Sequence, residues 1–240
     1  MTHHLSLPNT FVSSASQKLQ IILAAVAITV CGLGTTTAVS QDDAKQKEDG
    51  VPGVVTTADN WDIHYTYWES PMGKEAPVVI LLHGKGQARL VWNALPLANE
   101  LAKKQFAVIA VDLRKHGESK APETASVQAK SDKLSKFDYE GMVRGDLEAI
   151  KKFIYAEHQA QRLNMRKLGV VATDMSTAIA LNWATIDWGK KPFDDAPVAS
   201  ARTPRGQDVQ ALVLVSPVES LSGVGTINAP EYGLELYRAA

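Results

Sequence analysis

Four short apolar runs divide the middle and the carboxyl-terminal part of the chain. They are continuous rather than alternating, and they cover residues 78–82, 108–111, 168–171 and 211–215. A continuous run of this length is typical of a strand that is covered on both faces, as in a parallel sheet. We therefore expect four parallel strands, each with both faces buried.

Between these runs, apolar residues recur with the spacing of a helix face. The first such segment covers residues 92–101, the second 142–154 and the third 178–184. Strands that alternate with helices form a doubly wound α/β sheet, whose ligands bind at the carboxyl ends of the strands. The polar stretch 188–208, with several prolines, predicts a long loop before the last strand.

A different pattern precedes the first parallel strand. The β-rich runs 54–57 and 63–68 flank Asp59 and Asn60, and apolar and polar residues alternate in the second run. Such a pair of runs around a turn sequence predicts a β-hairpin.

The first 40 residues have the layout of a secretory signal. They contain Lys18 and no acidic residue, then the apolar run 21–30 and small residues near Ser40. We expect cleavage after Ser40 and export to the periplasm or the medium. An uncleaved anchor extending to Val39 is the alternative, and lipidation of Cys31 is less favoured because Val30 stands where a lipoprotein signal prefers a small residue. Residues 41–53 are charged and predict a flexible linker, so that the folded domain covers 54–240.

Composition excludes several classes of function. The chain has 25 Lys and Arg against 26 Asp and Glu, so no basic surface for nucleic-acid binding is indicated. Cys31 is the only cysteine, which excludes an intramolecular disulfide and a CxxC-type metal site. We expect no cofactor and no metal, a small molecule as the partner if the protein is active, and no stable membrane insertion once the signal is removed.

The candidate chemistry follows three strand ends. His83, Gly84, Lys85 and Gly86 follow the first parallel strand and can leave backbone N–H groups free for an oxyanion. Residues 112–119 follow the second strand, where a hydrogen-bonded polar turn is the simpler interpretation.

After the third strand the chain passes directly into a helix through Asp174. The small residues Ala172 and Ser176 stand two positions before and after it. A nucleophile elbow needs small residues at these two positions, because its strained turn leaves no room for larger side chains. Ser176 does not fit as the nucleophile, because Asp174 would then occupy one of the small positions.

Taken in order, LLHGKGQARLVW, AVIAVDLRKHGES and LGVVATDMSTAIALNWA resemble the oxyanion-loop, fourth-strand and elbow segments of the α/β-hydrolase superfamily. The resemblance spans roughly residues 61–217. It implies that Asp174 is the nucleophile, that the N–H groups of Met175 and Lys85 face the oxyanion site, and that His83 and Gly84 support that loop. Superfamily members with aspartate at this position include haloalkane dehalogenases and epoxide hydrolases, so the implied substrate is a small ester, epoxide or similar electrophile.

The resemblance is incomplete at the carboxyl-terminal end. The family's catalytic histidine follows the last strand, but none of the six histidines lies beyond residue 215. The run 211–215 resembles the sixth strand, which implies a doubly wound, mostly parallel sheet of the α/β-hydrolase type, truncated after that strand. Glu219 stands where some members keep the acid of the charge relay, although a surface or helix-capping role fits it as well.

Two alternatives to catalysis therefore stay open. In the first, the chain is a non-catalytic relative with a binding or structural role, and Asp174 caps the following helix with its carboxylate. Glycine is usual in the family where Ala172 and Ser176 stand, and Thr177 adds a branched side chain at the crowded helix start, which favours this alternative. In the second, the chain is a shortened gene product without activity.

Overall fold

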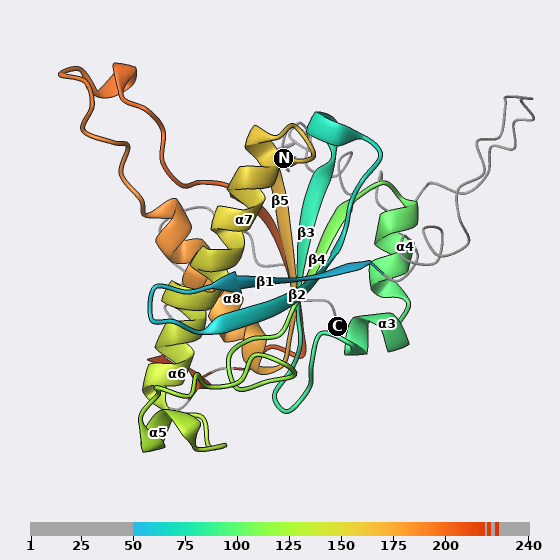
Figure 1. Ribbon diagram of the computed structural model, residues 1–240. Helices are drawn as coiled ribbons and strands as arrows, with labels where there is room; N and C mark the ends of the chain where they lie inside the picture. The colour runs from blue at the N-terminus through green and yellow to red at the C-terminus, as the bar shows by residue number, and fades with distance from the viewer. Residues whose placement is uncertain (1–49, 219, 222–223, 226–240) are drawn as a thin grey trace, which may run out of the picture. The chain divides into compact units, whose positions relative to one another are not determined.

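The computed structural model describes residues 50–218, 220–221 and 224–225 (Figure 1). The expected signal segment, residues 41–49 of the expected linker and Glu219 lie outside the described residues. Within them, the structure contains no helix that combines the length and the apolar character needed to cross a membrane.

A six-stranded sheet forms the centre of the described residues, in the order β1-β2-β4-β3-β5-β6 (Figure 1). β2 pairs antiparallel with both β1 and β4, and the remaining pairs are parallel. The predicted hairpin and the four predicted parallel strands are therefore confirmed. The strands are β1 (Val51–Thr56), β2 (Asp62–Trp68), β3 (Pro77–Leu82), β4 (Ala107–Val111), β5 (Asn164–Thr173) and β6 (Val209–Val215). A two-stranded hairpin follows, made of β7 (Ser220–Leu221) and β8 (Val224–Gly225).

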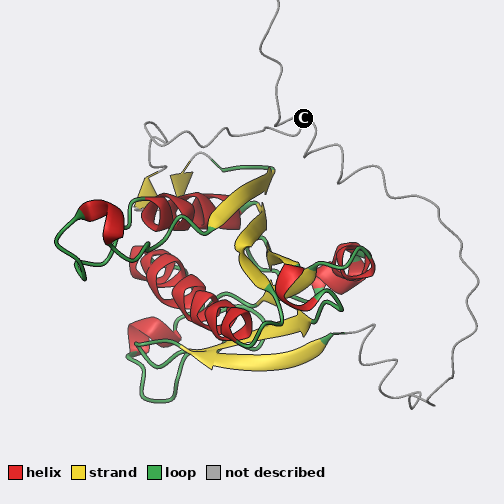
Figure 2. Ribbon diagram, turned by 90° about the horizontal axis from the view of Figure 1, so that it is seen from above, coloured by secondary structure: helices red, strands yellow, loops and turns green. Residues whose placement is uncertain are grey.

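Helices cover both faces of the sheet, as Figure 2 shows from above. One face carries α3 (Val91–Ala94) and α4 (Leu97–Lys103). The other carries α6 (Lys136–Gly141), the π-helical turn η2 (Met142–Asp146), α7 (Leu147–Gln159) and α8 (Met175–Trp188). The remaining short helices are α5 (Val127–Lys130) and the 3-10 turns η1 (Gly73–Glu75) and η3 (Ala199–Ala201).

The two faces of the sheet hold separate apolar cores. In β3, Val78, Ile80 and Leu82 pack in the core under α6–α8, whereas Val79 and Leu81 pack in the core under α3 and α4. This alternation follows from the two-residue period of a strand. It explains why β3 is apolar at every position, as was predicted for a strand covered on both faces.

Three features differ from the sequence-based expectation: the start of β1, the continuity of one helix and the burial of β6. β1 begins at Val51, so residues 51–53 belong to the sheet and not to the linker. The helix expected over residues 92–101 is two helices, because Pro96 has no N–H for the helical ladder and separates α3 from α4. β6 is covered on one face only: Val213 is 46% exposed and Val215 is 42% exposed. Within the described residues β6 is the edge strand of the sheet, so Val213 and Val215 have strand partners, Val171 and Thr173, on one side only.

Candidate active site

Asp174 occupies the single position between the end of β5 and the start of α8. Its backbone has φ 50° and ψ −124°, a region that costs a non-glycine residue about 1–3 kcal/mol. Main-chain groups hold it there: the Asp174 N–H donates to the carbonyl of Val215 (3.1 Å), and the Asp174 carbonyl accepts from the N–H of Thr177 (3.0 Å). The Thr177 hydroxyl donates to the same carbonyl (2.6 Å). The chain therefore makes the sharp strand-to-helix turn that the small flanking residues predict.

Ser176 locks this turn to the neighbouring strand. Its fully buried hydroxyl accepts the N–H of Thr173 (2.9 Å) and lies within hydrogen-bond distance of the carbonyls of Leu82 (2.9 Å) and Thr173 (2.8 Å). Where the family usually has glycine, the Ser176 hydroxyl forms hydrogen bonds that connect the end of β5 to the end of β3. Because its hydrogen-bonding capacity is used inside the protein, Ser176 is not placed as a nucleophile.

The carboxylate of Asp174 points toward the loop after β3. Its Oδ2 atom accepts the backbone N–H of Lys85 at 2.9 Å. The approach is close because Gly84 has no side chain: a Cβ at Gly84 would lie 3.2 Å from the Cβ and 3.3 Å from Oδ2 of Asp174. Asp174 makes no side-chain capping bond to α8. The helix-cap interpretation of Asp174 is therefore wrong, because its carboxylate is turned away from the helix and toward the loop.

The structure brings together four of the residues predicted for the site. Asp174, Lys85 and Gly84 meet directly, and Met175 is the first residue of α8, so its N–H has no partner within the helix. The side-chain amide oxygen of Gln87 accepts the N–H of Gly84 (3.0 Å) and fixes the loop from its other side. Sequence reasoning missed Gln87, because no spacing in the chain marks it.

His83 is fully buried beneath the loop, where both of its ring nitrogens are engaged. Its Nδ1 lies 2.8 Å from the carbonyl of Gly84, and its Nε2 accepts the N–H of Leu113 (3.2 Å). Nδ1 therefore carries the proton and the ring is neutral. Burial lowers the pKa of His83 to about 4, against the weaker opposing effect of the Gly84 carbonyl. His83 thus joins the loops after β3 and β4.

His116 lies against His83, with ring centroids 4.8 Å apart. Its Nδ1 is 3.0 Å from the carbonyl of Arg114, and burial lowers its pKa. His116 is therefore neutral near pH 7. Its ring lines a cavity together with Lys85.

The polar turn after β4 holds the sheet end together, as predicted. Asp112 is fully buried and accepts the N–H groups of Arg89 (2.6 Å) and Glu118 (3.0 Å). The guanidinium of Arg89 pairs with the carboxylates of Asp112 and Glu118. This network spans the loops after β3 and β4, and Arg89 is a partner that the sequence pattern did not indicate.

A second buried cation, Arg114, anchors the same turn to the helical layer. Its guanidinium pairs with Asp146 (2.8 Å) and Asp59 (2.8 Å). A Cβ at Gly141 would lie 2.1 Å from Arg114 Nη1, and one at Gly145 2.6 Å from Nη2. The four-residue spacing of these glycines places both on one helix face, a signal that sequence reasoning overlooked.

A cavity of about 480 Å³ borders the site. Its lining, called here the lysine cavity, consists of Lys85, Gly86, Lys115, His116, Asp132, Lys133 and Leu134. Because the N–H of Lys85 binds Asp174, one wall of this cavity is the loop that holds the candidate nucleophile.

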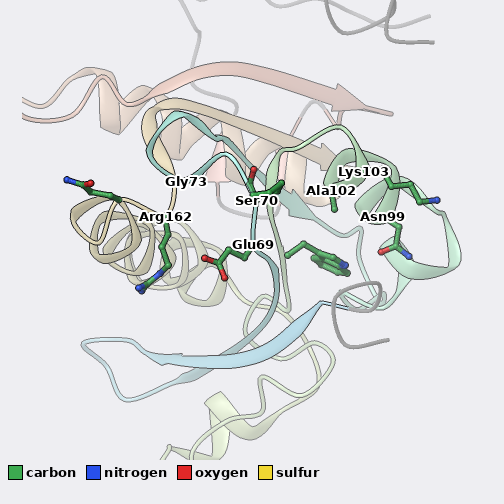
Figure 3. A pocket seen from close by; sticks show the side chains of 10 residues that line it. Glu69, Ser70, Gly73, Asn99, Ala102, Lys103 and Arg162 are labelled. Atoms are coloured by element: carbon green, nitrogen blue, oxygen red, sulfur yellow. The ribbon is translucent and has the colours of Figure 1, made fainter. Parts of the chain in front are cut away.

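Another cavity, of about 750 Å³, lies at the opposite end of the parallel strands, and Figure 3 shows side chains that line it. Glu69, Asn99 and Arg162 are among the side chains that surround it. β2 runs antiparallel to β4, so Glu69, directly after β2, lies at the amino end of β4. Arg162 precedes β5. This cavity is therefore at the amino ends of the parallel strands. Ligands of doubly wound sheets bind at the carboxyl ends, where Asp174 is located, so we place the candidate site there despite the larger volume of this cavity.

In residues 50–218 and the short described segments after them, no group of three or more His, Cys, Asp or Glu side chains is arranged to hold a metal ion.

Comparison with known proteins finds sequences that are similar to part of this chain. Over 59 residues the chain is 39% identical to protein phosphatase methylesterase 1 of Rattus norvegicus, and over 58 residues 43% identical to that of Homo sapiens. The stretch matched in the rat protein covers 25% of this chain and 15% of that protein, so the chain matches only a small part of these curated relatives.

Solved structures are also similar to part of the chain, at lower identity. An esterase of Pyrococcus furiosus is 20% identical, with a TM-score of 0.44 over 67% of this chain and 52% of that one. A variant epoxide hydrolase of Vigna radiata is 23% identical, with a TM-score of 0.40 over 56% of this chain and 34% of that one. Residues 77–236 match the family described as the alpha/beta hydrolase fold. This match covers more than half of the sequence, and the chain belongs to the alpha/beta hydrolase fold family.

Proposed function

We propose that this protein is a hydrolase that acts on a small ester, epoxide or similar electrophile, with Asp174 as its nucleophile. The observation that carries the proposal is the placement of the Asp174 carboxylate. It stands on a strained turn at the carboxyl end of β5, makes no bond to its own helix, and accepts the N–H of Lys85. Strained backbone of this kind clusters at functional sites, where the surrounding structure holds a side chain in a reactive position.

The hydrogen bond from Lys85 gives the two carboxylate oxygens of Asp174 different environments. Oδ2 is held by the loop, and within the described residues Oδ1 accepts no hydrogen bond. A carboxylate oxygen without a donor keeps its lone pairs available for attack on carbon. We assign the attack to Oδ1 and the stabilisation of charge on Oδ2 to the N–H groups of Lys85 and Met175.

For an epoxide the reaction has two steps. Oδ1 of Asp174 forms a bond to a ring carbon, the ring C–O bond breaks, and the released oxygen takes a proton from solvent water. Water then adds to the Cγ carbonyl of the resulting ester and forms a tetrahedral oxyanion beside Lys85. The Cγ–Oδ1 bond breaks, Oδ1 leaves with the diol, and the proton released with the free carboxylate neutralises the hydroxide that the first step left in solvent. One water is consumed and the enzyme is regenerated, with an oxygen of that water retained on Asp174.

The methylesterase similarity supports an ester as a second substrate class. The protein phosphatase methylesterase 1 sequences share 39–43% identity with this chain over 58–59 residues. With an ester, attack by Asp174 yields a mixed anhydride and releases the alcohol, and water again adds at Cγ or at the acyl carbon.

Isotope labelling tests the nucleophile directly. During turnover of styrene oxide in H₂¹⁸O, we expect the peptide that contains Asp174 to gain about 2 Da, because water attacks Cγ of the alkyl ester. With p-nitrophenyl acetate only turnover is measured, because water can also attack the acyl carbon of the mixed anhydride. Asp174→Ala should reduce turnover by about 10⁴-fold or more. Asp194→Ala is the matched control, because Asp194 is an exposed carboxylate on the loop after α8.

Two outcomes would contradict the proposal. Full turnover by Asp174→Ala, or turnover of styrene oxide by the wild-type protein without ¹⁸O at Asp174, removes Asp174 from the chemistry. A folded wild-type protein that turns over neither class of substrate and forms no ester at Asp174 would favour the non-catalytic alternative.

A further inference from the structure

The lysine cavity has an excess of positive charge. Three lysines, Lys85, Lys115 and Lys133, face one carboxylate, Asp132. The ammonium of Lys115 is already balanced by Asp138 (2.9 Å). In the part of the chain that the structure describes, Lys85 and Lys133 form no ion pair.

The charge continues into an adjoining cavity of about 280 Å³. The two cavities share Lys115 and Asp132, and the second adds Lys120, Lys130 and Glu123 to the lining. The Lys130 ammonium donates to the backbone carbonyl of Glu123 (2.6 Å), which does not neutralise it. Together the two cavities place four lysines that have no ion pair among the described residues against two carboxylates. The protein as a whole has a net charge of −1, so this edge of the sheet differs in sign from the whole.

The lysine cavity is also tied to the reacting group. Lys85 donates its backbone N–H to Asp174 and also lines the cavity, so one residue contacts both the carboxylate and the cavity. A substrate that reaches Asp174 through this side passes the ammonium groups. Because Asp174 must be ionised to attack, an anionic substrate would be repelled there unless nearby cations offset the repulsion.

The basic side chains of the lysine cavity are lysines only. Arginine is the residue that binds a carboxylate or a phosphate in a bidentate manner, and the lining contains none. Lysines supply point charges, which attract an anion such as a carboxylate without fixing its orientation. The neutral ring of His116 adds a polar surface without further charge.

We propose that the lysine cavity binds a carboxylate carried by the substrate, so that this protein acts on electrophiles with an acidic substituent. The inference rests on the proposed function, because it takes Asp174 as the reacting group. Lys85 and Lys133 are the residues that select such substrates, through charge rather than through shape.

The test is a calorimetric titration that needs no turnover. Glutarate is the probe, and the neutral diamide glutaramide is its control. We expect glutarate to bind at least about 10-fold more tightly, and this preference to weaken as salt screens the exposed ammonium groups. Lys133→Glu should weaken glutarate binding about 10-fold. Lys152→Glu is the matched control, because it makes the same charge change at a lysine outside both cavities.

A further variant fixes the location of the bound probe. Asp174→Asn removes the repulsive carboxylate and should tighten glutarate binding several-fold if the probe lies beside Lys85. If Lys133→Glu does not fold, Lys85→Gln replaces it, since that change keeps the backbone N–H. Equal binding of glutarate and glutaramide, or equal weakening by Lys133→Glu and Lys152→Glu, would overturn the proposal.

Failure of the subsite and failure of the nucleophile give different results. Loss of the nucleophile assignment appears as turnover by Asp174→Ala and leaves the titrations unchanged. Loss of the subsite appears as equal binding of the two probes, while ¹⁸O still enters Asp174.

Discussion

The backbone N–H of Lys85 and the carboxylate of Asp174 are joined by a hydrogen bond of 2.9 Å across 89 residues of sequence. The bond connects the loop after β3 to the turn after β5, two adjacent parallel strands. It exists because Gly84 lets the loop approach and because the backbone of Asp174 turns its side chain toward that loop.

A side chain at Gly84 that pushes the loop away from Asp174 should impair catalysis with little effect on the fold. In Gly84→Ala the added Cβ would lie 3.0 Å from Oε1 of Gln87 and 3.2 Å from the Cβ of Asp174, so the loop must move back. We expect turnover to fall about 10²-fold, the usual effect of displacing a reacting group by about 1 Å. Gly169→Ala is the control, because a Cβ there would make ordinary contacts at 3.9 Å. Equal turnover by the two variants would show that the approach does not matter.

Ser176→Ala should destabilise the elbow. The N–H of Thr173 would lose the hydroxyl that it donates to, and the bridge to Leu82 would be lost. An unsatisfied buried donor costs about 1–3 kcal/mol, which a shift in the urea midpoint can measure. Ser131→Ala, at an exposed site, should change stability by about 0.5 kcal/mol or less. A Ser176→Ala protein as stable as Ser131→Ala would contradict the locking role.

His83 should make stability depend on pH below neutrality. Its pKa is about 4 in the folded protein, against 6.5 for an unperturbed histidine, so the unfolded chain binds more protons between these values. The stabilisation is full above pH about 6.5 and is lost as the pH falls toward 4, by about 3 kcal/mol in total.

The difference between wild type and His83→Gln isolates this contribution, because the other titrating groups are shared. Urea unfolding at pH 7.5, 6 and 5 should show a steeper loss of stability for the wild type than for the variant. Parallel losses in the two proteins would show that His83 does not titrate as its burial indicates.

Gly141→Ala should destabilise the protein by about 3 kcal/mol or more. The new Cβ would overlap the guanidinium of Arg114 and separate it from Asp146, which leaves a charge that is fully buried without its partner. Thermal unfolding measured beside Gly169→Ala provides the comparison. Retention of the wild-type melting temperature in Gly141→Ala would mean that Arg114 has another place to lie.

The signal proposed from residues 1–40 has its own test. Expressed with a bacterial export system, the protein should lose these residues, and amino-terminal sequencing of the mature chain should begin at Gln41. A protein that keeps Met1 and sediments with membranes would support the uncleaved anchor instead.

The layered fold was predictable because the covered strands are apolar at every position. In β3 and β4 that pattern requires a core on each face, and the structure has both. The elbow was predictable for a related reason, since Ala172 and Ser176 leave room for the turn at Asp174. Both features depend on local sequence.

Features that depend on distant contacts were not predictable. The direction of the Asp174 carboxylate depends on a loop 89 residues away, which is why a helix cap looked equally good in the sequence. The exposure of Val213 depends on β6 having one strand neighbour among the described residues. The role of Gly141 depends on where Arg114 lies.

The turn at Asp174 is held through main-chain atoms: its N–H by Val215, its carbonyl by Thr177. None of these bonds involves the Asp174 side chain, so the frame does not depend on which reactive group it presents. The same frame would place an aspartate, a serine or a cysteine at the same point in space. Under the proposed function, exchange at residue 174 would therefore alter the reaction while the architecture around it persists, a route by which one scaffold acquires several chemistries.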